Sequence, residues 1–178
     1  MKKTILLGCL FCWMAIPLAH AKQPMKNGPF VGIDGIFGYE SKQIKKAGFG
    51  CGGQVGYRFT ERIAGYLQGD VFLMNDLNTT YEFIPIVPTV MYNFYDGVYA
   101  FLGAGYEWLH VSDGIRFGGV PLAAPTNYSG WTVESGVGYE FWIQKMITIA
   151  PQLGFNFARV AQSNIYIPNG RLNINYHF

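Results

Sequence analysis

The residue types best suited to nucleophilic chemistry occur together in the segment His110-Val111-Ser112-Asp113. A histidine that removes the proton of a nearby serine hydroxyl makes the serine a nucleophile, which could attack an acyl ester. His110 and Ser112 are two positions apart, so both side chains would project from the same face of a strand. The alternative is a polar strand end at a water boundary with no catalytic role, and we favour that interpretation.

Metal-binding and disulfide-forming residues are scarce beyond residue 21, where the histidines are His110 and His177 and the cysteine is Cys51. A lone cysteine has no intramolecular partner, and two distant histidines do not make a metal site. We therefore expect no metal, no cofactor and no intramolecular disulfide. Cys51 is expected to act as a small apolar residue.

A basic cluster, Lys42, Lys45 and Lys46, could contact phosphate groups, although a solvated loop is the favoured interpretation. It does not indicate nucleic-acid binding. Removing Lys2 and Lys3 with an N-terminal leader would leave as many basic residues as the 11 acidic ones, so the composition provides no electrostatic attraction for a polyanion.

Residues 1–21 have the pattern of a secretory signal peptide. Lys2 and Lys3 are followed by an apolar stretch and by Ala19-His20-Ala21, the small-x-small motif of a cleavage site. We expect cleavage after Ala21, leaving residues 22–178 as a single domain. Lipoprotein processing at Cys9 is an alternative that we disfavour, because the apolar run continues past that residue.

The composition and the hydrophobic pattern indicate a membrane protein without transmembrane helices. Charged residues make up 13% of the chain and aromatic residues 17%, whereas charged residues average about 25% of soluble domains. No apolar run of the ~18 residues needed for a spanning helix follows the leader. Because every backbone polar group must be paired in hydrocarbon, a closed β-barrel is the other spanning solution.

Four segments alternate as a barrel strand requires, with large apolar residues at odd positions and glycine or polar residues at even ones. These segments are residues 31–39, 49–59, 131–141 and 147–157. Four Tyr-x-Phe pairs recur at a spacing that suits every second strand. We predict that they form an aromatic girdle on the periplasmic side: Tyr57, Phe59, Tyr92, Phe94, Tyr139, Phe141, Tyr176 and Phe178.

The pattern predicts an all-β, eight-stranded antiparallel transmembrane barrel with up-and-down topology. The expected strands are 29–40, 47–60, 63–74, 81–94, 98–110, 129–142, 146–158 and 169–178. Short turns then alternate with longer outer connections at 41–46, 75–80, 111–128 and 159–168. Pro85 and Pro88 are expected to mark a bulge or bend. In the third outer connection, Phe117, Leu122 and Tyr128 are candidate host-contact residues.

The same alternation assigns polar side chains to the barrel interior, which in an eight-stranded barrel is just wide enough to be filled by side chains. We predict charge pairing around Arg171, with Asp70 and Glu134 at similar heights. A buried structural network is the favoured interpretation, and a gated proton or ion path is the alternative. The inward set is Asp34, Arg58, Gln68, Asp70, Glu107, Glu134, Gln152, Asn156, Arg171, Asn173 and Asn175.

The last strand, with Leu172, Ile174, Tyr176 and a terminal Phe178, resembles the C-terminal assembly signal of outer-membrane proteins. The segment 99–105 and the Gly-Tyr-x-Phe strand ends are similar to those of OmpA-type and opacity-type small barrels. This resemblance covers residues 22–178. It implies the outer membrane of a Gram-negative cell, surroundings of lipid and lipopolysaccharide, and periplasmic chaperones and the barrel assembly machinery as partners during biogenesis.

The resemblance leaves the function open, because this superfamily includes adhesins, serum-resistance factors, structural barrels and lipid-modifying enzymes. Lipid A deacylases carry a His-x-Ser-Asn motif in their last hairpin, where this chain has Ala161 in place of the histidine. We therefore expect a non-enzymatic barrel that supports envelope integrity or adhesion through its outer loops, possible contacts being host surface molecules. A lipid A acyl hydrolase and a small ion channel are the alternatives.

Overall fold

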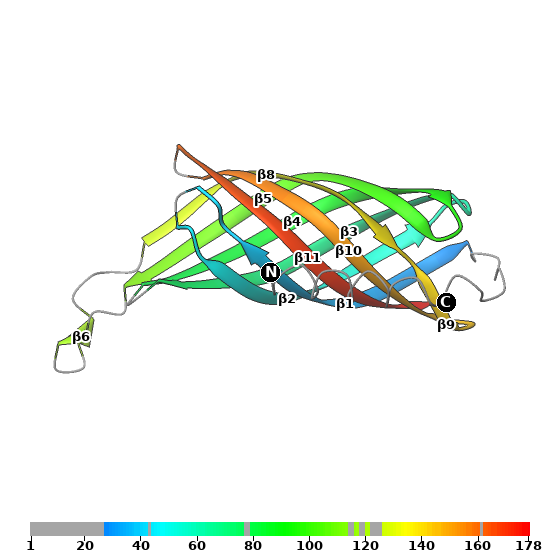
Figure 1. Ribbon diagram of the computed structural model, residues 1–178, viewed down its shortest axis with the longest axis horizontal. Helices are drawn as coiled ribbons and strands as arrows, with labels where there is room; N and C mark the ends of the chain where they lie inside the picture. The colour runs from blue at the N-terminus through cyan, green and yellow to red at the C-terminus, as the bar shows by residue number, and fades with distance from the viewer. Residues whose placement is uncertain are drawn as a thin grey trace, which may run out of the picture.

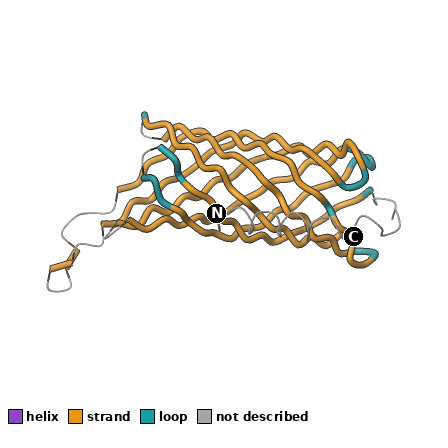
Figure 2. Tube along the Cα trace, in the orientation of Figure 1, coloured by secondary structure: helices purple, strands orange, loops and turns teal. Residues whose placement is uncertain are grey.

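The computed structural model describes residues 27–42, 44–76, 79–113, 116–117, 120–121, 126–160 and 162–178. The predicted signal peptide and its cleavage site lie outside these residues. Within them no helix is long and apolar enough to cross a membrane. The described residues form strands and the turns that join them (Figure 2).

A single antiparallel sheet closes on itself as an eight-stranded barrel (Figure 1), so the predicted fold class is confirmed. The strands of its wall follow one another in chain order, and β11 pairs with both β10 and β1. The wall strands are β1 (Gly28–Tyr39), β2 (Ala47–Arg58), β3 (Ile63–Asp76), β4 (Thr79–Tyr95), β5 (Val98–Asp113), β8 (Thr126–Tyr139), β10 (Ile147–Val160) and β11 (Ser163–His177).

Three short strands complete the topology. After an interruption at Glu140, β9 (Phe141–Gln144) continues the wall of β8 and pairs with β10. Between β5 and β8, β6 (Arg116–Phe117) pairs with β7 (Val120–Pro121) in a small hairpin that projects beyond the barrel (Figure 1). We call this end of the barrel the loop end, and the end that holds the C-terminus and β9 the turn end.

The turn end closes with tight connections, as the sequence predicted. Asp96 and Gly97 join β4 to β5, and both have positive φ angles, 28° and 87°. Asp-Gly is a favoured pair in such hairpins because both residues tolerate the left-handed region. A register shift in the same hairpin lies between Asn93 and Tyr95.

Pro85 and Pro88 were predicted to mark a bulge or bend, and the register shows no bulge at either residue. The register of β4 is the same on either side of the two prolines, both against β3 and against β5. Proline lacks the N–H that a ladder bond needs. In this barrel, residues around the two prolines drop out of the pairing while the strands stay aligned, so β4 needs no extra residue.

The last outer connection was also predicted wrongly. Residues 159–160 belong to β10 and residues 163–168 to β11, and Val160 pairs with Ser163. Ser163, Asn164 and Pro168 resemble loop residues, but Ile165 and Ile167 between them point inward and are buried. The third outer connection is likewise shorter than predicted, because β5 extends to Asp113 and β8 starts at Thr126.

Glycines on the inner face make room for the side chains of neighbouring strands. A Cβ atom at Gly52 would lie 2.6 Å from the carbonyl oxygen of Gly69 and would also meet the carboxylate of Asp70. By contrast, Gly69 occupies an outward position of β3, and a Cβ atom there would meet nothing within 4 Å. Inner glycine is therefore a packing requirement set by the narrow lumen.

The Gly52→Ala variant is expected to lose about 1–3 kcal/mol of unfolding free energy, the usual range for overpacking. The matched control Gly69→Ala adds the same methyl group to the outer face of β3, so its unfolding free energy should stay equal or rise. Urea unfolding in lipid vesicles, followed by tryptophan fluorescence, measures both. Equal losses in the two variants would contradict the inner-face packing.

Candidate functional site

The barrel interior is arranged in alternating apolar and polar layers, and β3 crosses them in order. From the turn end, its inward residues are the apolar Ala64 and Tyr66, the polar Gln68 and Asp70, and the apolar Phe72 and Met74, all buried. Polar residues lie in the lumen where the alternation predicted them, but the alternation did not indicate that the polar layer lies between two apolar ones.

The apolar layer nearest the loop end, which we call the outer plug, fills the lumen with side chains from six strands. Phe72 and Phe83 contact at its centre, with ring centroids 6.3 Å apart. The outer plug consists of Ile36, Phe72, Met74, Phe83, Leu109, Ala158, Val160, Ile165 and Ile167. These residues occupy inward positions in the alternation of their strands. The sequence pattern was read as apolar outside and polar inside, so apolar residues at inward positions were not predicted to form a layer of their own.

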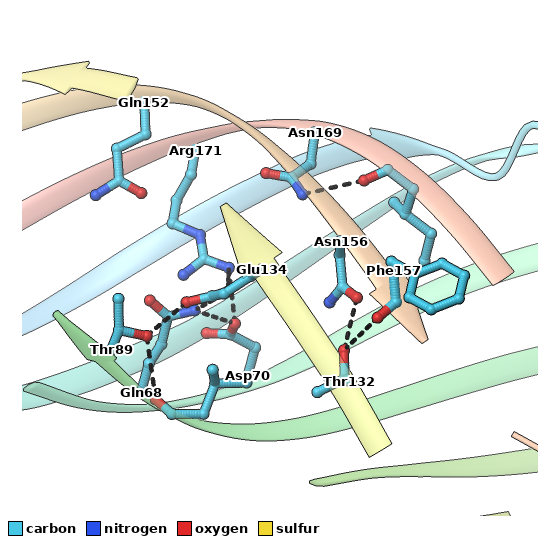
Figure 3. Close-up of polar contacts among 12 residues, drawn as sticks. Gln68, Asp70, Thr89, Thr132, Glu134, Gln152, Asn156, Phe157, Asn169 and Arg171 are labelled. Atoms are coloured by element: carbon cyan, nitrogen blue, oxygen red, sulfur yellow. Dashed lines mark hydrogen bonds and ion pairs between the residues drawn. The ribbon is translucent and has the colours of Figure 1, made fainter. Parts of the chain in front are cut away.

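The central polar layer is organised by Arg171, as Figure 3 shows. Arg171 Nη2 lies 2.8 Å from Asp70 Oδ2 and 3.9 Å from Glu134 Oε2, so the structure brings together the three residues that were predicted to pair. Gln68 Nε2 donates to both carboxylates, at 2.8 and 3.2 Å. The hydroxyl of Thr89 donates to Glu134 Oε1 at 2.9 Å.

Other inward amides are joined in pairs around this layer. Gln54 donates to Asn175 at 2.6 Å, and Gln152 donates to the Tyr99 hydroxyl at 2.8 Å. Thr132 donates to Asn156 Oδ1 at 2.7 Å, also visible in Figure 3. The first two bonds each span one intervening strand, β1 and β8 respectively, and the third joins the paired strands β8 and β10, so these amides link neighbouring parts of the wall across the inner face.

Two predicted lumen carboxylates lie inward but outside the Arg171 pairings. Asp34 and Glu107 are buried, and among the described residues the ion pairs of Arg171 are formed with Asp70 and Glu134. Asp70 and Glu134 share the guanidinium of Arg171, so carboxylates outnumber cations among the described residues of this layer.

A second ionic layer near the turn end was only partly foreseen. Arg58 was predicted to point inward, and its Nη2 lies 2.6 Å from Glu140 Oε2, with both side chains buried. Thr148 donates to Glu140 Oε1 at 3.2 Å, and His177 Nε2 lies 3.4 Å from the same oxygen. The ring of Trp142 covers His177 at 4.7 Å. Glu140 is at an even position, like the inward Glu134, and this alternation could have predicted that Glu140 also points inward.

Between the two ionic layers there is little empty space. A cavity of about 10 Å³ is lined by Arg58, Tyr66, Tyr99 and Gln152, among others. It has room for roughly one water molecule. The outer plug lies beyond it toward the loop end. In the described part of the chain, the lumen therefore resembles a packed core.

The candidate catalytic segment does not form a nucleophile–base pair. His110 and Ser112 share the outward face of β5 as predicted, but His110 Nδ1 is hydrogen-bonded to the side-chain oxygen of Asn127 on β8. No hydrogen bond joins His110 to Ser112 among the residues described. The side chain of Asp113 and the whole of Ala161 lie outside them.

The described residues of the first loop, 40–42 and 44–46, are held by the buried carboxylate of Glu40, which the sequence pattern placed at the end of a strand. Glu40 is fully buried and accepts hydrogen bonds from the backbone N–H groups of Lys42, Ile44 and Lys45. Ser41 N donates to the carbonyl of Tyr166 on β11 at 3.1 Å. The loop is thus tied to the wall of the barrel.

The three lysines of the basic cluster have different surroundings. Lys46 forms an ion pair with Asp76 at 2.9 Å, and the Lys42 ammonium lies over the ring of Tyr166, 5.1 Å from its centroid. Lys45 is exposed and has a positive φ of 56°. The cluster is therefore split between an ion pair and an aromatic contact.

The eight residues of the predicted girdle all lie on the outer face near the turn end. Within three of the Tyr-x-Phe pairs the rings contact each other, at 5.3 Å for Tyr57 and Phe59, 4.3 Å for Tyr139 and Phe141, and 5.0 Å for Tyr176 and Phe178. Leu172 and Ile174 are also outward and exposed. Their recognition by an assembly machinery stays a prediction.

Of the remaining predicted residues, Cys51 is a free thiol on the outer face. Tyr128 is an exposed residue of β8. Phe117 belongs to β6, but its side chain, like all of Leu122, lies outside the described residues.

The Arg171→Met variant tests the central layer. It leaves Asp70 and Glu134 buried without their cation, so a loss of about 3–5 kcal/mol is expected, as for other broken buried pairs. The heat-induced gel shift reports the unfolding temperature, and Arg62→Met, which removes a charge from an exposed turn, is the control. Adding Asp70→Leu to Arg171→Met should restore part of the loss. An unfolding temperature equal to that of the control would refute the network.

The Glu40→Ala variant tests the anchoring of the first loop. Three backbone N–H groups lose a charged acceptor, and charge-assisted bonds of this kind are the stronger ones. Trypsin should then cleave after Lys42 or Lys45 at least several-fold faster than in the parent protein, while the gel shift of the barrel persists. Thr60→Ala removes a hydroxyl acceptor from a turn at the other end and should leave cleavage at the lysines unchanged.

No protein-family model matches the chain, and no curated protein matches it. Among solved structures, Neisserial surface protein A is 18% identical with a TM-score of 0.61, covering 85% of this chain and 97% of that one. The N-terminal barrel domain of Pseudomonas aeruginosa OprF is 11% identical with a TM-score of 0.58, covering 85% and 100%. The attachment invasion locus protein Ail of Yersinia pestis is 14% identical with a TM-score of 0.52, covering 85% and 97%. The chain therefore has the fold of the small outer-membrane barrels of the OmpA and opacity type.

Proposed function

We propose that this chain is a non-catalytic outer-membrane barrel, closed to solutes, which supports envelope integrity or adhesion with residues at its loop end. The observation that carries this proposal is the filled lumen. With the interior occupied by the outer plug and two ionic layers, the surfaces left for function are the barrel exterior and the loop end.

The exterior supports a membrane location. Large apolar side chains stand exposed around the middle of the wall, among them Ile33 at 67%, Leu102 at 63% and Leu153 at 68%. An exposed apolar surface of this extent is unfavourable in water, and in soluble monomers contiguous apolar patches rarely exceed a few hundred Å². Acyl chains would remove that cost, and the alternation of the wall strands is the pattern that lipid-facing strands need.

The proposed orientation places the loop end toward the cell exterior and the turn end in the periplasm. Short periplasmic turns and longer outer loops are usual for such barrels. Periplasmic chaperones and the assembly machinery would then meet Leu172, Ile174, Tyr176 and Phe178 during insertion. Ail, whose name refers to attachment and invasion, shares the fold, which supports adhesion as one of the proposed roles.

One complementation experiment separates the competing functions. A strain lacking the gene would receive the parent protein, a His110→Ala and Ser112→Ala double variant, or a variant in which a Gly-Ser turn replaces residues 114–125. Detergent sensitivity, binding to host cells and the lipid A mass spectrum are recorded for each strain. We expect the parent and the double variant to restore the first two equally, and the shortened loop to lose host-cell binding, detergent resistance, or both.

The lipid A mass spectrum should be the same in every strain. Loss of an acyl chain that depends on the parent protein and disappears in the double variant would replace this proposal with the hydrolase. A null result in detergent sensitivity and cell binding with the parent protein would reject the surface role.

Planar bilayers test closure. The parent protein should give no stepwise conductance, because the outer plug offers no polar path. Replacing Phe72 and Phe83 of the outer plug, together with Tyr66 and Tyr99 of the inner apolar cluster, with Ser should produce conducting events, because both apolar layers then lose their large rings. The exterior variant, Phe37 and Phe49 to Ser, should remain silent. Discrete conductance in the parent protein would contradict a closed barrel.

A further inference from the structure

Aromatic rings and two cations gather on the barrel exterior at the loop end of β8, β10 and β11. Tyr166 on β11 contacts Phe157 on β10 at 5.0 Å, and Phe157 contacts Trp131 on β8 at 5.1 Å. Lys42 and Arg159 border this row of rings. We call these five residues the rim site.

Lys42 is held in place before any ligand arrives. Its backbone N–H donates to Glu40 at 2.9 Å, and the preceding Ser41 is bonded to the carbonyl of Tyr166. Its ammonium group lies over the Tyr166 ring at 5.1 Å. Fixing a long side chain in advance lowers the entropic cost of binding.

Arg159 lies on the same exterior face, further toward the loop end than Phe157. It is exposed. In the strand register it lies opposite Trp131 of β8 and opposite Asn164 of β11. Directly opposite side chains on a sheet have Cβ atoms about 4.5–5.5 Å apart, and diagonal ones such as Arg159 and Tyr166 are within about 8 Å. Arg159 on β10 and Lys42 in the loop after β1 therefore both lie next to Tyr166.

We infer that the rim site binds a phosphate group of an outer-leaflet glycolipid whose acyl chains lie along the aromatic row. A guanidinium and an ammonium together suit a phosphate monoester, the guanidinium by its planar fork and the ammonium as a point charge. The rings below continue into the exposed apolar wall at Phe155, which contacts Tyr166 at 5.9 Å. A ligand must therefore be anionic at one end and apolar at the other, which favours a membrane lipid over a soluble phosphate.

The inference rests on the proposed outer-membrane location, and it goes beyond that proposal by assigning residues and a ligand class. It also differs from the basic cluster in the sequence. Lys46 is already paired with Asp76 and lies outside the site, whereas Arg159, distant in sequence from the lysines, is included.

The test uses the full mature barrel refolded in vesicles and transferred to detergent for native mass spectrometry. The probes are bisphosphorylated lipid A and the same lipid with both phosphates removed. The test variant is Lys42→Gln with Arg159→Gln. The control variant is Arg62→Gln with Lys145→Gln, which removes two exposed cations from the turn end.

We expect the parent protein and the control to bind the phosphorylated lipid at least tenfold more tightly than the dephosphorylated one, and the test variant to lose that preference. Equal binding of both lipids by the parent protein, or an unchanged preference in the test variant, would overturn the inference. Displacement of the bound lipid by millimolar inorganic phosphate would also overturn it, since the site would then recognise free phosphate. Failure to refold into vesicles would count against the membrane location itself, whereas refolding without lipid preference rejects the rim site alone.

Discussion

The fixed and small interior of an eight-stranded closed sheet is the constraint on which the rest of this structure depends. Closure pairs β11 with β1 and leaves no open edge in the wall, so each inward position must share one narrow volume with side chains from the other strands. Inner glycines such as Gly52 follow directly, because Asp70 occupies the space that a side chain at that position would need. The narrow lumen therefore determines which side chains fit at inward positions, and this limit produces the alternation along the strands.

Layering of the interior is the second consequence. Buried charges are tolerated where partners reach them across the lumen, as Asp70 and Glu134 reach Arg171 and as Glu140 reaches Arg58. Such pairs gain little over apolar packing in net stability, yet each is costly to break on one side. Apolar layers on either side exclude water and strengthen the pairing. The outer plug and the inner cluster around Tyr66 and Tyr99 have this role in addition to filling space.

Much of the fold was predictable, because a period of two is preserved over whole strands and assigns each residue to a face. Parity alone placed Arg171, Asp70 and Glu134 in the lumen, and the turn-end rings on the exterior. It failed at strand ends, where Ile165 and Ile167 continue the pattern through residues typical of loops. The prolines of β4 misled for a related reason: a missing N–H interrupts pairing, but the aligned neighbours on both sides keep the register.

The candidate sites were less predictable, because contacts across the barrel depend on which residues of non-neighbouring strands reach the same height. Nothing local in the sequence relates Arg58 to Glu140, and the partner of His110 proved to be Asn127 rather than Ser112. The first loop depended on one buried carboxylate, Glu40, whose role is visible only once three backbone N–H groups converge on it.

A filled lumen also limits where this protein can be changed without harm. An inward residue is constrained by neighbours from several strands, whereas an outward residue near the middle of the wall needs only to be apolar. Exposed side chains at the loop end are bound by neither condition, in contrast to the buried Glu40, which holds the first loop. Lys42 and Arg159 have this character: both are exposed, both adjoin aromatic rings, and neither belongs to an ionic layer of the interior. A cation beside an exposed ring offers a charged contact and an apolar contact next to each other, and this combination at the rim, together with the filled lumen, is the reason that ligand binding is proposed for the rim site.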